Sequence, residues 1–328
     1  MKSLVIGYGS IGKRHIENLS KIKNMDILVC TKQKKDNFLK KHNCKVYVSL
    51  NSCLKDSPDF ALICNETHYH VSTAIELAKN KINFFIEKPL SDSLSGTKKL
   101  LDLIKNNNLI TMVGCNFRFH PSIIEIRNII KKNQLGRIIS VRTENGSFLP
   151  DWHPHEDYKK NYASLKKLGG GVILTSIHEL DYLIWLFGKI QNIQSFSGKY
   201  SNLKIDVEDL SITLIHFKNN IIAELYLDFF QKPPSRYCKL IGTKGTLYWD
   251  YSSNQLKLYE HKKEKWVVKL NNKNYDLNNM YVDELDHFMN CIKNNSQTIN
   301  SVENSLETLS LALLMKKASI SKKMEKVN

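Results

Sequence analysis

The sequence lacks the long apolar runs and paired cysteines that mark membrane, secreted and zinc-binding proteins. No stretch of its 328 residues approaches the roughly 18 consecutive apolar residues of a membrane helix. The N-terminus also lacks the long apolar segment of a signal peptide. The seven cysteines are scattered, with no CxxC pair. We therefore expect a protein of the reduced cytoplasm, with no membrane partner and no metal site.

Arginine is sparse, and no stripe of alternating aromatic and basic residues occurs. The net charge of +16 comes mostly from lysine, in runs such as residues 32–35 and 262–265. This distribution indicates a solvated, lysine-rich surface, not a nucleic-acid-binding face. Attraction of an anionic small molecule is compatible with it.

The chain has no long linker, no internal repeat and no low-complexity segment, and its length suits two domains. Strand and helix patterns alternate over residues 1–120, which predicts a parallel sheet with helices on both faces. The expected helices are residues 12–21, 69–80 and 93–106. The expected strands are residues 3–7, 26–31, 45–48, 60–65, 83–87 and 110–115.

After residue 120 the pattern changes to that of a second domain, residues 121–328. A helix over residues 122–133, a strand over 137–144 and a strong helix over about 171–187 lead into successive strands over 190–268. This order predicts an α+β domain with an open-faced, mostly antiparallel sheet. Helices at residues 279–294 and 302–322 close the chain, and the last one is a candidate to pack back on the first domain.

The stretch "GYGSIGKRH" follows the first strand and opens the first helix. Gly7 permits a tight turn, Gly9 lets the backbone approach a pyrophosphate, and Gly12 lets the helix pack closely on the strand. The backbone N–H groups around Ser10 and Ile11 then face the phosphates at the helix N-terminus. The alternative is a plain glycine turn. The context favours an α/β protein with an N-terminal Rossmann, doubly wound sheet that binds NAD or NADP.

The second strand ends without the Asp or Glu that binds the ribose of NAD. Thr31 and Lys32 stand there, followed by Lys34. These side chains, with Arg14, could contact a 2′-phosphate, which favours NADP over NAD. The alternative is that the lysines are only solvated.

Further polar residues follow the later strands of the predicted sheet. Glu87-Lys88-Pro89 ends one strand, and Asn65 and His70 follow another. Ligands of a parallel sheet bind beyond the carboxyl ends of its strands. We therefore predict that Asn65, His70, Glu87 and Lys88 line the cofactor crevice.

Six motifs together resemble the Gfo/Idh/MocA oxidoreductase family, which includes glucose–fructose oxidoreductase and inositol dehydrogenase. They cover residues 1–188 and read "GYGSIGKRH", "ALICNETHYH", "FFIEKPLS", "GCNFRFHP", "LGRIISVR" and "GGGVILTSIHELDYLIWLFG". The resemblance implies a Rossmann domain, an open-faced sheet domain, a nicotinamide cofactor and a sugar, polyol or nucleotide-sugar substrate. It also implies that Lys88 and His178 lie at the nicotinamide, and that a cis peptide precedes Pro89.

Alcohol oxidation needs a group that takes a proton near neutral pH. Histidine does so without any perturbation, and a lysine does so when it is desolvated or lies beside a cation. We predict His178 as the general acid/base, with Lys88 hydrogen-bonding or relaying the proton. Many family members place an Asp one turn before this histidine, but residues 174–177 contain none. Either Thr175 replaces it as a substrate contact or the acid/base pair is incomplete. Asp181 either orients the imidazole or bonds to backbone.

The loop of residues 148–158 is rich in polar and aromatic side chains. Trp152 could stack on a sugar ring, while His153, Asp157 and Tyr158 could bond to its hydroxyls. The alternative is a loop that only packs its own aromatic residues. The two histidines of the loop lack a third ligand at metal-binding spacing. This loop resembles those of family members in surface-sugar biosynthesis.

We therefore predict an NAD(P)-dependent oxidoreductase acting on a sugar, polyol or nucleotide-sugar. The alternatives are a non-catalytic ligand sensor and a cofactor-assisted glycosidase on the same fold. Arg118, near the predicted domain junction, either holds an anionic group of the substrate or braces that junction. The alternating apolar residues of 210–217 and 221–229 predict a homodimer or homotetramer paired through the open sheet.

Overall fold

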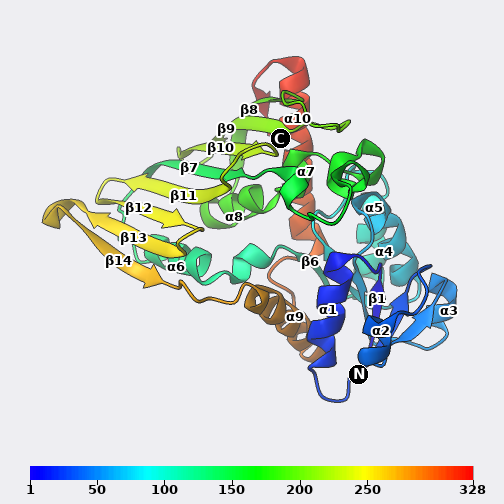
Figure 1. Ribbon diagram of the computed structural model, residues 1–328. Helices are drawn as coiled ribbons and strands as arrows, with labels where there is room; N and C mark the ends of the chain where they lie inside the picture. The colour runs from blue at the N-terminus through cyan, green and yellow to red at the C-terminus, as the bar shows by residue number, and fades with distance from the viewer. Residues whose placement is uncertain (328) are drawn as a thin grey trace. The chain divides into compact units, whose positions relative to one another are not determined.

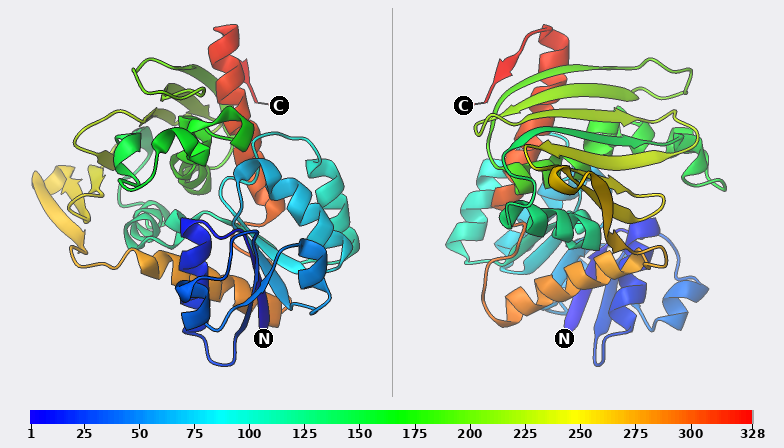
Figure 2. Two further views of the ribbon diagram at one scale, coloured as in Figure 1. Left: turned by 45° about the vertical axis from the view of Figure 1, so that its right-hand side comes forward. Right: turned by 90° about the vertical axis from the view of Figure 1, so that its left-hand side faces the viewer.

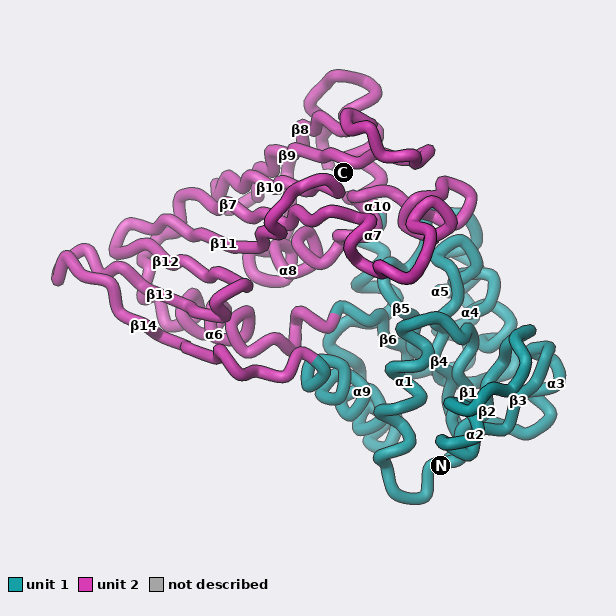
Figure 3. The backbone as a smooth tube through the Cα atoms, in the orientation of Figure 1, with its two compact units in different colours: residues 1–115, 278–309 teal, residues 116–277, 310–328 magenta. Residues whose placement is uncertain are grey.

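The computed structural model describes residues 1–327, which form two compact units (Figure 3). The first unit comprises residues 1–115 and 278–309, and the second comprises residues 116–277 and the chain from residue 310. The chain thus leaves the first unit five residues before the predicted boundary and returns to it after residue 277. Among the described residues, no helix is long and apolar enough to cross a membrane.

The first unit contains a six-stranded parallel sheet in the order β3-β2-β1-β4-β5-β6. This is the predicted Rossmann arrangement, which is confirmed. Its central strands are buried on both faces, as the continuous apolar run of residues 60–64 predicts. The strands are β1 (Lys2–Ile6), β2 (Asp26–Cys30), β3 (Lys45–Tyr47), β4 (Phe60–Ile63), β5 (Asn83–Glu87) and β6 (Thr111–Gly114).

Helices cover both faces of this sheet. Helix α9 comes from the distant segment 278–309 and packs beside α1. Phe288 of α9 is fully buried, and its ring meets those of Phe60 and Phe85 edge-on at 5.8 and 5.9 Å. The helices of this unit are α1 (Ser10–Ser20), α2 (Asn37–Lys41), α3 (Leu50–Leu54), α4 (His70–Lys79), α5 (Thr97–Asn106) and α9 (Asn278–Lys293).

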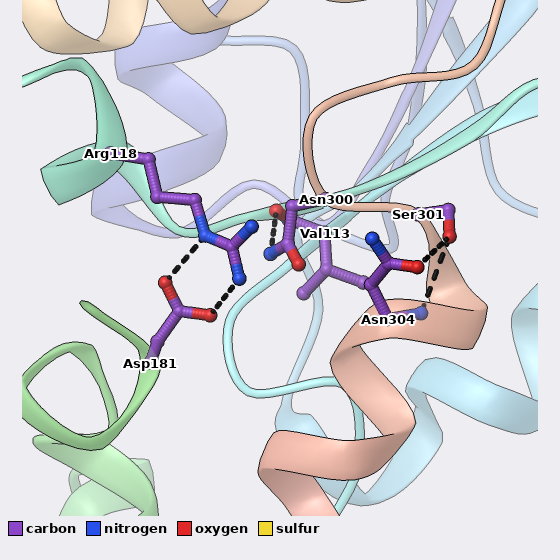
Figure 4. Close-up of polar contacts among 6 residues, drawn as sticks. All are labelled: Val113, Arg118, Asp181, Asn300, Ser301 and Asn304. Carbon is purple, nitrogen blue, oxygen red and sulfur yellow. Dashed lines mark hydrogen bonds and ion pairs between the residues drawn. The ribbon is translucent and has the colours of Figure 1, made fainter. Parts of the chain in front are cut away.

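The open edge of β6 is closed by the segment that follows α9. Val113 donates its backbone N–H to the Asn300 carbonyl at 2.8 Å, and the Asn300 side chain returns a hydrogen bond to the Val113 carbonyl (Figure 4). Ser301 then caps α10 (Val302–Ser321) by accepting from the Asn304 N–H. Residues 278–309 therefore complete the first sheet, although they lie far from it in the sequence.

The second unit is built on a nine-stranded mixed sheet, β14-β13-β12-β11-β7-β10-β9-β8-β15. Only β7 and β10 pair in parallel; all other neighbours are antiparallel, as predicted. The strands are β7 (Ile138–Gly146), β8 (Ile190–Gly198), β9 (Leu210–Phe217), β10 (Ile222–Asp228), β11 (Ser235–Gly242), β12 (Gly245–Asp250), β13 (Gln255–Glu260), β14 (Lys265–Asn271) and β15 (Glu325–Lys326).

Helices α6 (Pro121–Lys131) and α8 (His178–Phe187) cover one face of this sheet (Figures 1 and 2). Side chains alternate along the strands, so β9 buries Thr213, Ile215 and Phe217 on that face. The opposite face carries Leu214, which is 51% exposed, and Phe196 of β8, which is 62% exposed. The predicted open-faced sheet is therefore present.

The helix predicted over about 171–187 is two helices. Helix α7 (Val172–Thr175) ends at Thr175, with Ser176 as its C-cap, and α8 begins at His178. The backbone dihedrals of Ser176 leave the helical region, although neither Gly nor Pro marks the break. Thr175 and His178 therefore lie on either side of this interruption and not on one continuous helix.

We predict that Phe288→Ala lowers the free energy of unfolding by about 3–5 kcal/mol, since it leaves a cavity where α9 meets the first sheet. Urea unfolding measures this loss. Ile320→Ala, at a side chain that is 84% exposed, is the control and should change little. A loss below about 1 kcal/mol for Phe288→Ala would show that α9 is not part of this core.

Candidate functional site

The glycine turn of the first unit has the geometry that its sequence predicts. Gly7 has φ of +102°, which residues with side chains rarely adopt, and a Cβ there would lie 2.6 Å from the Asn65 backbone N. A Cβ on Gly12 would lie 2.2 Å from the Gly7 carbonyl oxygen. Two of the three glycines are therefore required by the protein's own packing.

Gly9 is different, because nothing in the protein requires a glycine there. Its φ of −81° suits any residue, and a Cβ on it would meet no atom within 4 Å. It is the N-cap of α1, and no side chain caps the helix. The N–H groups of Ser10, Ile11 and Gly12 lie in the first turn, where helices leave such donors without intrahelical partners. Open space in front of an uncapped helix N-terminus fits the pyrophosphate of a dinucleotide.

The end of β2 presents the predicted basic residues. Thr31 accepts the Gln33 N–H at 3.1 Å, and Lys32 and Lys34 are exposed. A carboxylate that the sequence analysis missed lies nearby in the same unit. Asp36 accepts the hydroxyl of Tyr8, a residue of the glycine turn, at 2.8 Å, and it also caps α2.

Asn65 lies in the loop after β4 and His70 is the first residue of α4, both at the predicted sheet edge. The Asn65 Oδ1 atom is buried and has no hydrogen-bond partner within residues 1–327. His70 is also buried, and its two ring nitrogens lie 2.9 Å from the Asn65 carbonyl and 2.8 Å from the Pro89 carbonyl. Burial lowers the pKa of His70, although these two hydrogen bonds raise it by a smaller amount. His70 thus braces two loops, and its predicted cofactor contact stays a prediction.

Glu87 is the last residue of β5, and Lys88 follows it at the same edge of the sheet. Glu87 Oε1 lies 2.6 Å from His15 Nε2 of α1, and Oε2 accepts the Lys88 backbone N–H at 3.3 Å. Protein groups therefore use both carboxylate oxygens, so the cofactor contact predicted for Glu87 also stays a prediction. The Lys88 side chain is half-buried, and the Lys88–Pro89 peptide is cis, as the resemblance implies.

In the second unit, His178 is the first residue of α8 and only 8% exposed. Its ring lies 5.0 Å from that of Phe117, centroid to centroid. Thr175, at the end of α7, is buried. The structure thus brings Thr175 and His178 together at the break between two short helices.

Two buried carboxylates follow His178 in the first turn of α8, and each is paired with an arginine. Asp181 accepts two hydrogen bonds from Arg118, both at 2.8 Å (Figure 4). Glu179 lies 2.9 Å from the Nε atom of Arg236 in β11. The guanidinium of Arg118 is thus engaged by the Asp181 carboxylate, and the roles predicted for both residues stay predictions. Carboxylates near a helix N-terminus are also favoured by the helix dipole.

An aromatic cluster surrounds Phe117. His120 stacks on it at 5.7 Å, and the Arg236 guanidinium lies 4.4 Å from its ring centroid. His120 accepts the Ser122 N–H and so caps α6. Burial, with the nearby Arg236 charge, lowers the pKa of His120 to about 4. His120 is therefore a neutral aromatic residue at physiological pH.

The polar loop of residues 148–158 consists of short 3-10 turns. Trp152 donates its indole N–H to Ser147 Oγ at 2.9 Å and meets the Phe229 ring edge-on. The Tyr158 hydroxyl accepts the Lys204 N–H at 3.2 Å, and His153 is half-buried. Trp152 and Tyr158 thus contact their own unit, which is what the packing alternative describes. Their substrate contacts stay predictions.

The sequence analysis missed the partners of the charged side chains. His15, Asp36 and Arg236 all lie far along the chain from the groups that they contact, and no local pattern marks such pairs. One signal was available for Asp36: an Asp that precedes a short helical run is a typical N-cap. Within residues 1–327, no group of three or more His, Cys, Asp or Glu side chains is placed to hold a metal ion.

Comparison with known families decides the classification. The model described as "Oxidoreductase family, NAD-binding Rossmann fold" matches residues 1–115. The model described as "Oxidoreductase family, C-terminal alpha/beta domain" matches residues 127–328. The chain belongs to the Gfo/Idh/MocA oxidoreductase family. The Gly7–Gly12 turn lies within the part of the chain that matches the family's NAD-binding domain.

Members of this family with known activities resemble the chain along most of its length. The scyllo-inositol 2-dehydrogenase (NAD(+)) of Bacillus subtilis is 23% identical over 321 residues, which is 91% of this chain and 88% of that protein. The myo-inositol 2-dehydrogenase of Thermotoga maritima is 24% identical, over 76% of this chain and 75% of that protein. A solved levoglucosan dehydrogenase in complex with NADH has the same fold, with a TM-score of 0.90 at 15% identity over 100% of this chain and 99% of that chain.

We predict that Gly9→Val abolishes most of the dinucleotide affinity without unfolding the protein. The new side chain meets open space in the protein but occupies the place of the pyrophosphate. Calorimetric titration should show at least about a tenfold weaker Kd. The melting temperature should stay near that of the wild type.

Gly12→Ala is the contrasting variant, because its methyl group collides with the Gly7 carbonyl and should lower the melting temperature. Undiminished dinucleotide affinity in a folded Gly9→Val protein would contradict the assignment of this turn.

Proposed function

We propose that the protein is an NAD(P)-dependent dehydrogenase or reductase that transfers a hydride between the cofactor and a CH–OH group of a sugar, polyol or nucleotide-sugar. The observation that carries the proposal is the open, uncapped N-terminus of α1 at Gly9, in a chain of an oxidoreductase family. The names of its relatives, which include inositol and levoglucosan dehydrogenases, support a sugar or polyol substrate.

When bound, the nicotinamide cofactor accepts or supplies the hydride. The chain's own residues must then move the hydroxyl proton and hold the substrate. We assign His178 as the general acid/base and Lys88 as the group that hydrogen-bonds the reacting oxygen or relays its proton. The Glu179–Arg236 pair keeps the charge beside His178 balanced. In place of the carboxylate that many family members carry, Thr175 offers a hydroxyl for a substrate contact.

We also propose the compartment in which the protein acts and the residues that contact its substrate. The seven free cysteines suit a reducing cytoplasm. The loop of residues 148–158 supports a substrate from surface-sugar biosynthesis, with Trp152, His153 and Tyr158 as its contacts. Arg118 has a carboxylate partner already, so we assign it a bracing role in its own unit.

We propose that NADP binds more tightly than NAD. Lys32 and Lys34 are exposed at the end of β2, where no acidic residue directly follows the strand. The carboxylate of Asp36 is engaged by Tyr8 and by the first turn of α2.

The double variant Lys32→Ala/Lys34→Ala should bind NADP about tenfold more weakly and leave NAD binding unchanged, since only NADP has a 2′-phosphate. Fluorescence titration with both cofactors measures this. Lys40→Ala/Lys41→Ala, which removes the same charge from α2, is the matched control. A wild-type preference for NAD that the lysine substitutions do not alter would contradict the proposal.

His178→Ala and Lys88→Ala should each lower turnover by about 10²-fold or more, the usual contribution of a placed acid or base. Cofactor affinity should stay nearly intact, and the pH profile of the residual activity should lose a limb. Steady-state kinetics and cofactor titration measure these effects. His42→Ala and Lys79→Ala, at surface positions of the first unit, are the controls.

The same experiment separates the alternatives. A sensor would bind cofactor or sugar with no turnover in the wild type, and a cofactor-assisted glycosidase would cleave substrate with no net change in cofactor. A wild type that turns over a sugar and a His178→Ala variant with its full rate would refute the role of His178.

We also propose a homodimer or homotetramer that pairs through the open face of the second sheet. Phe196, Ile212 and Tyr226 lie side by side across β8, β9 and β10, and Leu214 lies in the next row. Arg142 and Glu224 pair at 3.0 Å on the same face. Exposed apolar side chains in adjacent rows are typical of an interface between copies.

Leu214→Glu should therefore convert the protein to monomers at micromolar concentration, because it places a charge in the paired faces. Light scattering after size exclusion measures the mass. Ile320→Glu, outside this face, is the matched control and should leave the oligomer intact. A monomeric wild type would contradict the proposal.

A further inference from the structure

His15 and Glu87 form a fully internal polar contact that the proposed chemistry does not use. His15 is 0% exposed and Glu87 is 6% exposed. Their side chains meet at 2.6 Å across the gap between α1 and the end of β5. The His15 Nδ1 atom is buried and has no hydrogen-bond partner within residues 1–327, so Glu87 is the partner that fixes this ring.

The contact joins two functional parts of the first unit. His15 lies in the second turn of α1, whose N-terminus holds the open space at Gly9. Glu87 directly precedes Lys88, and its second oxygen accepts the Lys88 backbone N–H. One carboxylate thus connects the helix that faces the dinucleotide to the backbone of the lysine that we assign to proton transfer.

The surroundings leave little freedom to this carboxylate. A Cβ on Gly114 would lie 3.4 Å from Glu87 Oε2, so β6 forms the wall of its slot. The ring of His15 meets Phe85 edge-on at 5.5 Å and Tyr281 at 6.3 Å. A buried polar pair in such a setting stabilises a fold no better than apolar side chains of similar volume. Its presence therefore points to a task beyond packing.

Other titratable groups also face Glu87. Its charge raises the pKa of the Cys64 thiol in addition to the larger effect of burial. Burial lowers the pKa of His70, whereas the charges of Glu87 and Asp92 act in the opposite direction and raise it. Arg14 lies over the ring of Tyr281, 4.4 Å from its centroid. The pH dependence of activity in a Glu87 variant thus reflects these charged and titratable neighbours as well as Lys88.

We propose that the hydrogen bond between His15 and Glu87 is a positioning device that fixes Lys88 relative to the dinucleotide-binding helix. Misplacement of a reacting group by about 1 Å costs about 10²-fold in rate. Loss of the hydrogen bond should therefore lower kcat far more than it weakens cofactor binding. The proposal rests on the proposed role of Lys88.

The test compares His15→Leu, which removes the donor, with His15→Gln, whose amide can still donate to Glu87. We expect His15→Leu to lose about 10²-fold in kcat. In this variant, the Kd for the preferred cofactor should change less than about threefold. The limb of the kcat–pH profile that Lys88→Ala removes should shift along the pH axis. His15→Gln should recover most of kcat and the normal limb. His42→Gln, the same substitution near the surface of this unit, is the control.

Glu87→Gln is the second arm and covers the case in which His15→Leu fails to fold. It is nearly isosteric but carries no charge, and we expect a lower kcat and a shifted limb for it too. An unchanged kcat and pH profile in folded Glu87→Gln, or in folded His15→Leu, would overturn the proposal and leave a purely structural pair. If Lys88→Ala itself keeps full turnover, the proposed role of Lys88 fails instead, and the two failures are thereby distinguished.

Discussion

The close approach of helix α1 to strand β1 is the constraint on which the proposed cofactor site depends. A Cβ on Gly12 would lie 2.2 Å from the Gly7 carbonyl oxygen, so only a hydrogen atom fits between helix and turn. The uncapped helix N-terminus is thereby held at the carboxyl edge of the sheet, where strands β2, β4 and β5 also end. The buried contact between His15 and Glu87 fixes the same helix a turn further on. The glycine turn is thus rigid at each side of the open space at Gly9.

In the second unit, two carboxylate–arginine pairs lie in the helical turn that begins at His178. Glu179 and Asp181 are buried in the first turn of α8, and each has an arginine partner. Leaving either carboxylate buried without its arginine would cost about 3–5 kcal/mol, so these pairs fix the turn that begins at His178. His120, with its pKa lowered to about 4, adds an aromatic ring but no charge. His178 is the other imidazole beside Phe117, and it is the first residue of this turn.

Local signals in the sequence predicted the first sheet well, because its strands are short apolar runs bounded by glycines and polar turns. Every predicted strand of that sheet lies within two residues of the observed bounds. The place of α9 was not predictable in this way, since an amphipathic helix does not encode which sheet it packs against. The break at Ser176 was missed because no Gly or Pro marks it. Motifs and the family resemblance predict the glycine turn, Lys88 and His178 as site residues, whereas the partners of Glu87 and Arg118 depend on the tertiary structure.

Hydrogen–deuterium exchange with and without saturating NADP tests most directly whether the N-terminus of α1 binds the dinucleotide. The account predicts slower exchange of the backbone amides of residues 9–13, whose N–H groups would face the phosphates. It predicts no comparable change at the edge strand β14 of the second unit. Measurable binding of NADP or NAD with unchanged exchange over residues 9–13 would contradict the central claim.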